Sequence, residues 1–462
     1  MLAETSGVTM TDEQKLAKDV VKGELELLCP EMQLLSCPNY DTSLFDGTGL
    51  IRTRSGGRLL FEIVGRYDRG FPPLAKSSSP IHGQIPDPDD HVMLRAVDAH
   101  GREWRSNWVI PKTFPSGSRS STWTVSCALE SLMHVEARSS SDISEGRLYI
   151  ELPGPLPFDQ ATHTTKKVGE ELRDQEWSID HHACMINSAQ VEFRQHESRL
   201  LTVLARQVPP VMPDWAGLVC QALSLATAQT VRPIVAVREF NTRKDIGIFS
   251  GPFSYPRSYL TRPIPPSEVK DFWALIQKFI EWATSVGSSV AADLFDELEG
   301  IRNGSMGSIR TAALTLATAV ESLADLLLAC IEVEREFSDK IDSLLEHVRD
   351  WNGDVAIRHR ATSMLGSLKQ IRSVDRLHQF VQIRGISAEL VEAWKKLRDV
   401  VAHGRAPDSH QQLYDRYFST TELLYRIIAF AIGYQGSICA TATHGWGLNE
   451  WGFPAKSTPK VD

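Results

Sequence analysis

The pattern of apolar residues changes near the middle of the chain, and this change limits the fold more than any single motif does. Between residues 45 and 250, short runs of alternating apolar and polar residues are separated by stretches rich in glycine and proline. After residue 267, apolar residues recur every three or four positions over long segments. Alternation is typical of strands, and a period of three to four residues is typical of helices. The sequence therefore predicts an α+β protein, with a β-rich N-terminal region followed by an all-α bundle.

Five runs in the first region show this alternation and are predicted to be strands of a mainly antiparallel structure. They are 58–65, 104–110, 122–126, 147–152 and 190–194. Turn-rich connections are expected at 69–90 and 153–160, and a helical insert around 214–229. In the second region, helices are expected at about 267–285, 308–332, 336–350, 355–372, 387–402 and 410–433.

These patterns divide the chain into five segments. We expect an N-terminal helical or irregular segment at 1–40, a β-rich domain at 41–252, a proline-rich linker at 253–266, an α-helical domain at 267–435 and a C-terminal tail at 436–462. The linker is predicted from its closely spaced prolines, and the start of the helical domain from a capping serine with acids in the first turn.

Composition and charge are those of a folded protein without a general affinity for nucleic acid. The chain of 462 residues is 42% hydrophobic and 23% charged, which is ordinary for globular proteins and sufficient for two or three domains. Its formal net charge is −9. Any binding of nucleic acid must therefore depend on a local basic surface.

Cysteine usage and apolar patterning predict a cytoplasmic protein that does not associate with a membrane. The seven cysteines are scattered and form no CxxC pair, which favours a reducing compartment. The N-terminal residues lack a basic region followed by an apolar run, so no secretory signal is expected. The longest apolar stretch, roughly 311–331, carries Glu321 and Asp325, whose charges would be costly in a bilayer.

The best functional candidate is an arginine and a histidine that close one helix. The spacing Arg-x4-His occurs three times, at Arg95/His100, Arg398/His403 and Arg405/His410. The first copy is typical of a strand that runs into a turn, and the third contains Pro407, which prevents a regular helix. Only the second follows a helical apolar pattern, over 390–401, with Gly404 as a stop signal.

This pair of side chains suits cleavage of RNA without a metal. The imidazole of His403 can move a proton near neutral pH, and the guanidinium of Arg398 can hold a phosphate that gains charge in the transition state. No metal or cofactor is expected, because His181, His182 and Cys184 form at most half of a metal site and nothing completes it.

The helical geometry sets a condition on this interpretation. Five residues place Arg398 and His403 about 140° apart around an ideal helix. They can meet over one phosphate only if the helix ends near Ala402, or if a second copy of the chain contributes. The alternative is that Arg398 is a solvated helix residue and that His403 stabilises the C-terminal end of the helix dipole.

Two further groups of residues accompany this pair. Glu321 falls where the apolar face of its helix should continue, so it needs a partner unless it faces water, and Arg398 is a candidate. The window 349–384 is locally basic, and on one face its arginines could follow an RNA backbone; the alternative is a normally solvated helix pair. The candidate RNA-binding residues are Arg358, Arg360, Arg372 and Arg376.

The helical region from about 300 to 435 resembles a HEPN domain. The resemblance rests on the acidic Glu321 in an early helix and on the late sequence Leu-Arg-Asp-x-x-Ala-His-Gly at 397–404. That ending is typical of bacterial anti-phage proteins of the ApeA kind, which also have a larger β-rich N-terminal region. The similarity implies a dimeric, metal-independent endoribonuclease acting in phage defence by abortive infection, with a possible phage-derived trigger sensed by the β-rich region.

The resemblance also implies roles for single residues. His403 would be the general acid or base and Arg398 the phosphate clamp. Asp399 would be the polar residue that follows the arginine, where asparagine is common among relatives. Glu321 would orient or pair with the arginine.

Two alternatives of other classes remain. A non-catalytic HEPN module would use Arg398 and His403 only to bind RNA, a nucleotide or a protein partner. An enzyme in the β-rich region is the second alternative, but the sequence contains neither a GxxxxGK(S/T) loop nor a GxSxG motif.

Overall fold

A computed structural model gives the fold of the chain. It describes residues 11–36, 42–66, 92–109, 112–115, 121–137, 146–154, 156, 158, 160–168, 171–195, 200–208, 214–240, 243–251, 259–265, 267–286, 288–331, 336–367, 372–403, 409–440 and 447–450. The chain forms two compact units, one of Met1–Cys220 with Val231–Tyr255 and the other of Gln221–Thr230 with Pro256–Asp462. The division passes through the helix α2 (Trp215–Thr227).

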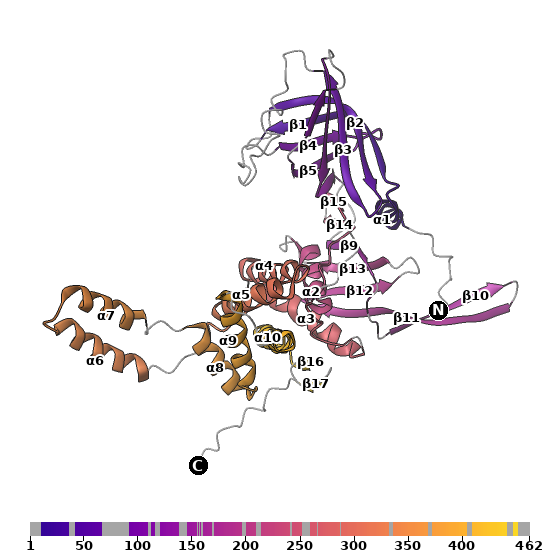
Figure 1. The fold of residues 1–462 in the computed structure, drawn as a ribbon. Helices are drawn as coiled ribbons and strands as arrows, with labels where there is room; N and C mark the ends of the chain where they lie inside the picture. Colours follow the sequence, from indigo (N-terminus) through magenta and orange to yellow (C-terminus); the bar gives the residue numbers. More distant parts are fainter. Residues whose placement is uncertain are drawn as a thin grey trace. The chain divides into compact units, whose positions relative to one another are not determined.

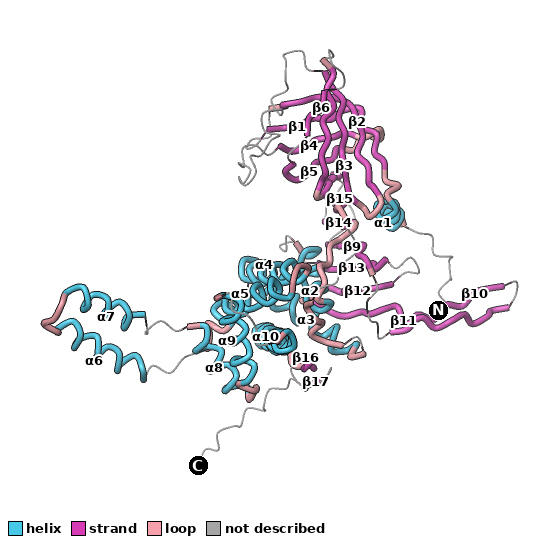
Figure 2. Tube along the Cα trace, viewed as in Figure 1, coloured by secondary structure: helices cyan, strands magenta, loops and turns pink. Residues whose placement is uncertain are grey.

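The first unit is a single large antiparallel sheet with one helix (Figures 1 and 2). Its elements are α1 (Asp12–Lys22), β1 (Glu26–Ser36), β2 (Ser43–Arg54), β3 (Arg58–Arg66), β4 (Val92–Val97), β5 (Glu103–Val109), β6 (Lys112–Pro115), β7 (Thr122–Leu129), β8 (Ser131–Ala137), β9 (Gly146–Pro153), β10 (Gln160–Val168), β11 (Glu171–Ile186), β12 (Ala189–Gln195), β13 (Leu200–Val208), β14 (Val235–Phe240) and β15 (Arg243–Phe249). The 15 strands follow the order β10-β11-β12-β13-β9-β14-β15-β8-β5-β4-β1-β2-β3-β7-β6.

The alternating runs in the sequence do form strands. The five expected runs overlap β3, β5, β7, β9 and β12, and the expected helical insert is α2. In β4, buried and half-buried residues alternate along the strand, and the chain turns directly after Val97. The copy of the Arg-x4-His spacing at Arg95 therefore does run from a strand into a turn. The expected connection at 69–90 lies outside the described residues.

The expectation of a helical or irregular segment at 1–40 is wrong for its second half. Residues 26–36 form β1, which lies between β4 and β2 in the sheet. The register of β1 against β2 shifts between Cys29 and Met32, around Pro30. Buried positions therefore change from odd to even numbers along the strand, which hides the alternation in the sequence. Proline is tolerated in a strand at such an irregularity, because its missing N–H is not needed for the ladder there.

The helix α1 covers part of the core of the first unit. Thr11 caps its start, since the Thr11 hydroxyl accepts the N–H of Gln14, and Gly23 ends it with a φ of 77°. Ala17 and Val20 of α1 are fully buried. They join one apolar cluster with residues of β1, β2, β3, β4, β5, β7, β8, β13, β14 and β15.

The second unit is helical, so the α+β class is confirmed. Its elements are α3 (Val269–Val286), α4 (Ser288–Ser305), α5 (Ile309–Leu327), α6 (Glu336–Asp350), α7 (Val355–Ser367), α8 (Ser373–Arg384), α9 (Glu389–Ala402), α10 (His410–Ala431) and the hairpin β16 (Ser437–Ala440) and β17 (Gly447–Glu450). The helix α5 contacts α4, α8, α9 and α10. Its buried face is rich in alanine, and these small side chains let neighbouring helices approach closely. None of the helices in the described part of the chain has the length and apolarity needed to cross a bilayer.

Two helices were not expected from the sequence. The helix α4 has a regular apolar stripe at Ala291, Leu294, Leu298 and Ile301, but apart from Val290 and Phe295 its other residues are polar or small. The expected helix at 355–372 is wrong at its last residue, because Arg372 has an extended backbone and caps α8, which begins at Ser373. The helix α7 is described to Ser367, and 368–371 lie outside the described residues. Asp375 closes the start of α8, because its carboxylate accepts the backbone N–H of Arg372 at 3.2 Å.

The described parts of the expected linker and tail belong to the folded second unit. Leu260 and Ile264 of the expected linker are buried in the second unit. These apolar side chains stand among the prolines of the segment. The backbone N–H of Cys439 donates to the carbonyl of Pro263 at 2.8 Å. The segment 259–265 and the strand β16 are therefore parts of the second unit's fold, and 252–258 lies outside the described residues.

A fully buried carboxyl group lies within the sheet of the first unit. Glu151 of β9 has no exposed surface. The hydroxyls of Tyr149 and Thr202 both donate to its Oε1, and no partner for its Oε2 is found among the described residues. Burial raises the pKa of Glu151 above its ordinary value, and the two hydroxyl donors only partly oppose this.

We expect Glu151→Gln to remove part of the pH dependence of stability. In the unfolded chain this carboxyl loses its proton near pH 4.3, whereas the folded protein retains it to higher pH. The folded state then binds more protons, so the free energy of unfolding of the wild type falls as the pH rises above that value. Thermal melting of both proteins from pH 5 to pH 8 should show the wild type losing stability relative to the variant. Parallel curves would contradict this expectation.

Candidate functional site

One hydrogen bond fixes α9 against α5. The indole Nε1–H of Trp394 donates to the carbonyl of Ala317 at 2.9 Å, and Trp394 is 2% exposed. The small side chain of Ala317 leaves room for the ring. This contact sets both the separation and the register of the two helices.

The same register brings Glu321 and Arg398 together. Each lies four residues, about one turn, after a member of the Trp394–Ala317 pair, so α5 and α9 run parallel at this point. Arg398 Nη2 lies 2.8 Å from Glu321 Oε1, which is the pairing that the sequence predicts. The Arg398 guanidinium also lies 6.0 Å from the ring centre of Trp394. The two side chains are 51% and 35% exposed, so the ion pair contributes about 0.2–1 kcal/mol to stability.

The helix α9 ends where the pairing of Arg398 with His403 requires. Its last residue is Ala402, and His403 caps it with a φ of −97° and a ψ of 5°. The His403 N–H donates to the Asp399 carbonyl at 3.3 Å, and His403 Nε2 lies 3.6 Å from Asp399 Oδ1. The His403 side chain is 65% exposed. The expected stop signals at Gly404 and Pro407 lie outside the described residues.

This end of α9 therefore combines three kinds of group on an accessible surface. His403 supplies an imidazole with a carboxylate beside it, which can accept or donate a proton. Arg398 uses one of its five N–H donors on Glu321, and its fork suits a phosphate. In the described part of the chain, no three His, Cys, Asp or Glu side chains lie close enough together to hold a metal ion.

The four candidate RNA-binding arginines lie on two helices and differ in how they are engaged. On α7, Arg358 Nη1 donates to the Trp351 carbonyl at 3.1 Å, and Arg360 is exposed. Arg372, which caps the start of α8, contacts both carboxylate oxygens of Asp375 at 3.1 Å.

Arg376 of α8 faces the neighbouring helix α5. Its Nε lies 3.5 Å from Asp325 Oδ1, without hydrogen-bond alignment, and its Nη1 donates to the Leu328 carbonyl at 3.4 Å. Ser373 also donates to Asp325, at 2.9 Å. Among the described residues, these contacts leave only Arg360 of the four without a partner. A role in RNA binding stays a prediction for all four.

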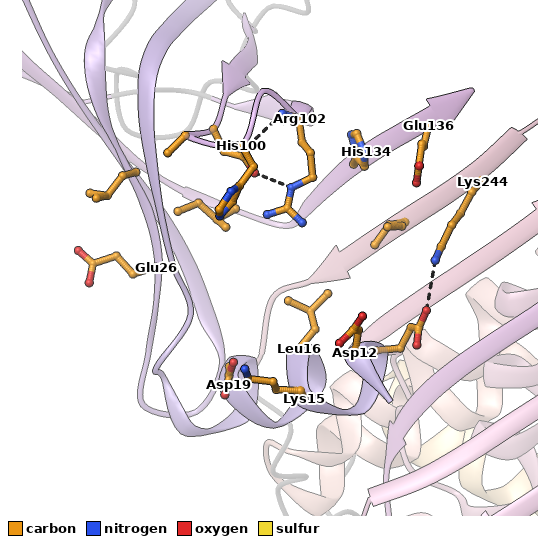
Figure 3. A pocket seen from close by; sticks show the side chains of 16 residues that line it. Asp12, Lys15, Leu16, Asp19, Glu26, His100, Arg102, His134, Glu136 and Lys244 are labelled. Atoms are coloured by element: carbon orange, nitrogen blue, oxygen red, sulfur yellow. Dashed lines mark hydrogen bonds and ion pairs between the residues drawn. The ribbon is translucent and has the colours of Figure 1, made fainter. Parts of the chain in front are cut away.

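The first unit contains a cavity that the sequence did not indicate. It has a volume of about 730 Å³ and lies between α1, β1, the turn after β4, β8 and β15 (Figure 3). Asp98 anchors that turn, accepting hydrogen bonds from Arg102 at 2.8 Å and from the Trp104 indole at 3.1 Å. Burial alone would raise the pKa of Asp98, but these hydrogen bonds outweigh it and lower the pKa below its usual range.

The arginine of the first Arg-x4-His copy is engaged in the sheet. Arg95 lies 2.7 Å from Glu31 and 2.8 Å from Glu103. His100 lines the cavity shown in Figure 3, at the turn. The guanidinium of Arg95 is thus held by two carboxylates, whereas that of Arg398 is held by one.

Comparison with known proteins adds no relative: no protein family, curated protein or solved structure matches this chain. The candidate site therefore rests on its own residues and geometry, and on the resemblance of the sequence around Arg398 and His403 to HEPN domains. In the last turn and a half of α9, Arg398 pairs with Glu321 and His403 lies next to Asp399, and within the described residues no contact joins Arg398 to His403.

We expect Trp394→Phe to destabilise the second unit by about 1–2 kcal/mol, because it removes a buried hydrogen bond and leaves a small void. Urea unfolding followed by circular dichroism measures the change. The matched control is Trp351→Phe, at a residue that is 46% exposed, for which we expect a change within about 0.5 kcal/mol. Equal effects of the two substitutions would contradict the role of Trp394 in fixing α9 against α5.

Proposed function

We propose that the second unit is a HEPN domain and that the end of α9 is the active site of a metal-independent endoribonuclease. The observation that carries the proposal is the ion pair of Arg398 with Glu321 at 2.8 Å, next to a helix end that exposes His403. The sequence around this pair is the part that resembles HEPN domains.

The proposed reaction begins with the 2′-hydroxyl of the nucleotide at the cut. Its oxygen forms a bond to the adjacent phosphorus while its proton passes to an imidazole, and the bond from phosphorus to the 5′-oxygen breaks. The leaving 5′-oxygen takes up a proton, so the products are a 2′,3′-cyclic phosphate and a 5′-hydroxyl. Arg398 stabilises the extra charge on the phosphoryl oxygens.

The remaining groups have positioning roles in this mechanism. Asp399, with Oδ1 3.6 Å from His403 Nε2, would orient the imidazole ring. Glu321 holds the Arg398 fork in one orientation. Because one step removes a proton and another supplies one, a homodimer that presents two copies of His403 to one RNA would serve both steps.

A non-catalytic module is the second candidate. Arg398 and His403 each have a carboxylate neighbour in their own chain, and such a site can also bind a phosphate of RNA or of a nucleotide without cleaving it. That candidate predicts RNA affinity that depends on Arg398, with no turnover.

The biological setting of the proposal comes from the resemblance to anti-phage proteins of the ApeA kind. In that setting the protein acts in the cytoplasm, a phage component triggers the β-rich unit, and RNA cleavage ends the infection together with the cell. Expression in a bacterial host followed by phage challenge would test this. Protection by the wild type that His403→Ala abolishes is the expected result.

We expect purified protein to cleave total cellular RNA in EDTA and to leave 2′,3′-cyclic phosphate ends. His403→Ala should reduce the rate by about 100-fold or more, the usual contribution of a general acid or base. The control His347→Ala changes an exposed histidine of α6 and should cleave like the wild type. Cleavage of DNA, inhibition by EDTA, or an active His403→Ala variant would each contradict the mechanism.

We expect Arg398→Lys to retain RNA binding and to lose most cleavage. Lysine keeps the charge but lacks the planar fork, so the transition state loses one of its donors at a cost of about 100-fold in rate. Filter binding and single-turnover cleavage separate the two effects. An equal loss of binding and of rate would contradict a role of Arg398 in the transition state and would limit it to binding the RNA.

A further inference from the structure

A second cavity lies on the sheet of the first unit, apart from the residues of the proposed ribonuclease. It has a volume of about 510 Å³ and is formed by β9, β12, β13, β14 and the start of α1. Cavities of about 300–1,000 Å³ are typical of small-molecule sites. Strand order brings these elements together, since β13, β9 and β14 are neighbours in the sheet.

Two arginines lie side by side in the wall of this cavity, on adjacent strands. Arg206 of β13 is the register partner of Arg147 of β9, so their side chains leave the same face of the sheet. Both are exposed. Within the described residues neither has an ion-pair or hydrogen-bond partner. Like charges directly opposite each other destabilise an antiparallel pair. On its other side Arg147 is the register partner of Glu239 of β14, which offsets part of this repulsion without forming an ion pair.

The other charged residues at the wall or beside it form ion pairs. Arg194 lies 2.6 Å from Glu192. Lys244 lies 3.2 Å from Glu13 and 3.6 Å from Glu239, and Figure 3 shows its ion pair as a dashed line. Across these residues and the two arginines, seven in all, four positive charges stand against three negative ones, so the cavity has one positive charge in excess, and Arg147 and Arg206 are its two cations without an ion-pair partner among the described residues.

The backbone beside Arg206 has an unusual conformation. The register of β13 against β9 shifts between Arg206 and Val208, and Gln207 has a φ of 60°. A residue other than glycine at such a φ costs about 1–3 kcal/mol. Bulges of this kind re-aim the side chains next to them, and here the bulge lies next to Arg206.

The wall beside the arginines offers both polar and apolar surface. The hydroxyls of Tyr149 and Thr202 are fixed by their hydrogen bonds to the buried Glu151. Leu204 and Val237 line the cavity beside them. An organic group attached to the anion would contact this surface.

We propose that this cavity binds a small molecule through a phosphate monoester, with the forks of Arg147 and Arg206 holding the doubly charged group. Guanidinium and phosphate match in geometry as well as in charge, and paired N–H···O contacts are stronger than neutral hydrogen bonds. The proposal does not depend on ribonuclease activity, because all of its residues belong to the first unit.

Calorimetric titration of the full chain with adenosine 5′-monophosphate, inorganic phosphate and adenosine tests the proposal. We expect both phosphate probes to bind and adenosine to bind far more weakly. Arg147→Gln and Arg206→Gln should each weaken phosphate binding at least about tenfold, the effect of losing a charge-assisted hydrogen bond. Tighter binding of the nucleotide than of phosphate identifies an organic ligand, and equal binding identifies the phosphate group alone as the determinant.

A matched control and a measurement without ligand keep the test sharp. Arg52→Gln removes an exposed arginine of β2, 4.0 Å from Glu62, and should leave binding unchanged. In the absence of ligand, Arg147→Gln should melt at or above the wild-type temperature, because it relieves the repulsion from Arg206. No binding of either phosphate probe, or equal weakening in Arg52→Gln, would overturn the proposal.

Discussion

The hydrogen bond from the Trp394 indole to the Ala317 carbonyl fixes the register on which the candidate active site depends. Once α9 is held there, Arg398 reaches Glu321 one turn further along. The alanine-rich face of α5 permits this close approach, and the exposed ion pair adds little stability of its own. Burial of the tryptophan therefore provides the energy, and the ion pair sets the direction of the guanidinium.

Register has a similar role in the sheet of the first unit. The pairing of β13 with β9 places Arg206 opposite Arg147, and Thr202 beside Glu151. Thr202 and Glu151 belong to a buried hydrogen-bonded network, whereas Arg206 and Arg147 form a repulsive pair on the surface of a cavity. Folded proteins retain unfavourable local arrangements mainly where a function requires them. We thus propose a phosphate site in each unit, with its arginines on helices in one and on strands in the other.

Periodicity was sufficient to predict the α+β class and most of the helices, because each depends on residues close together along an element. For Glu321 the sequence offered Arg398 as a candidate partner beside an alternative in which Glu321 faces water, and the structure shows the pair. The strand β1 could not be predicted, since the irregularity at Pro30 changes which side chains face the core. The apolar stripe of α4 is present in the sequence, but the many polar residues around it make the helical pattern difficult to recognise. The cavity of Arg147 and Arg206 could not be predicted either, because strand order brings together residues from distant parts of the chain, and a single sequence does not determine that order.

Replacement of one ribose in an RNA substrate tests the central claim most directly. An oligonucleotide with a single 2′-deoxy nucleotide on the 5′ side of a mapped cut should resist cleavage at that bond while its other bonds are cut at the normal rate. This result is predicted because the 2′-hydroxyl is the nucleophile in the reaction assigned to His403 and Arg398. Cleavage at the deoxy position at an unchanged rate would show that another nucleophile attacks the phosphorus, and would contradict the account.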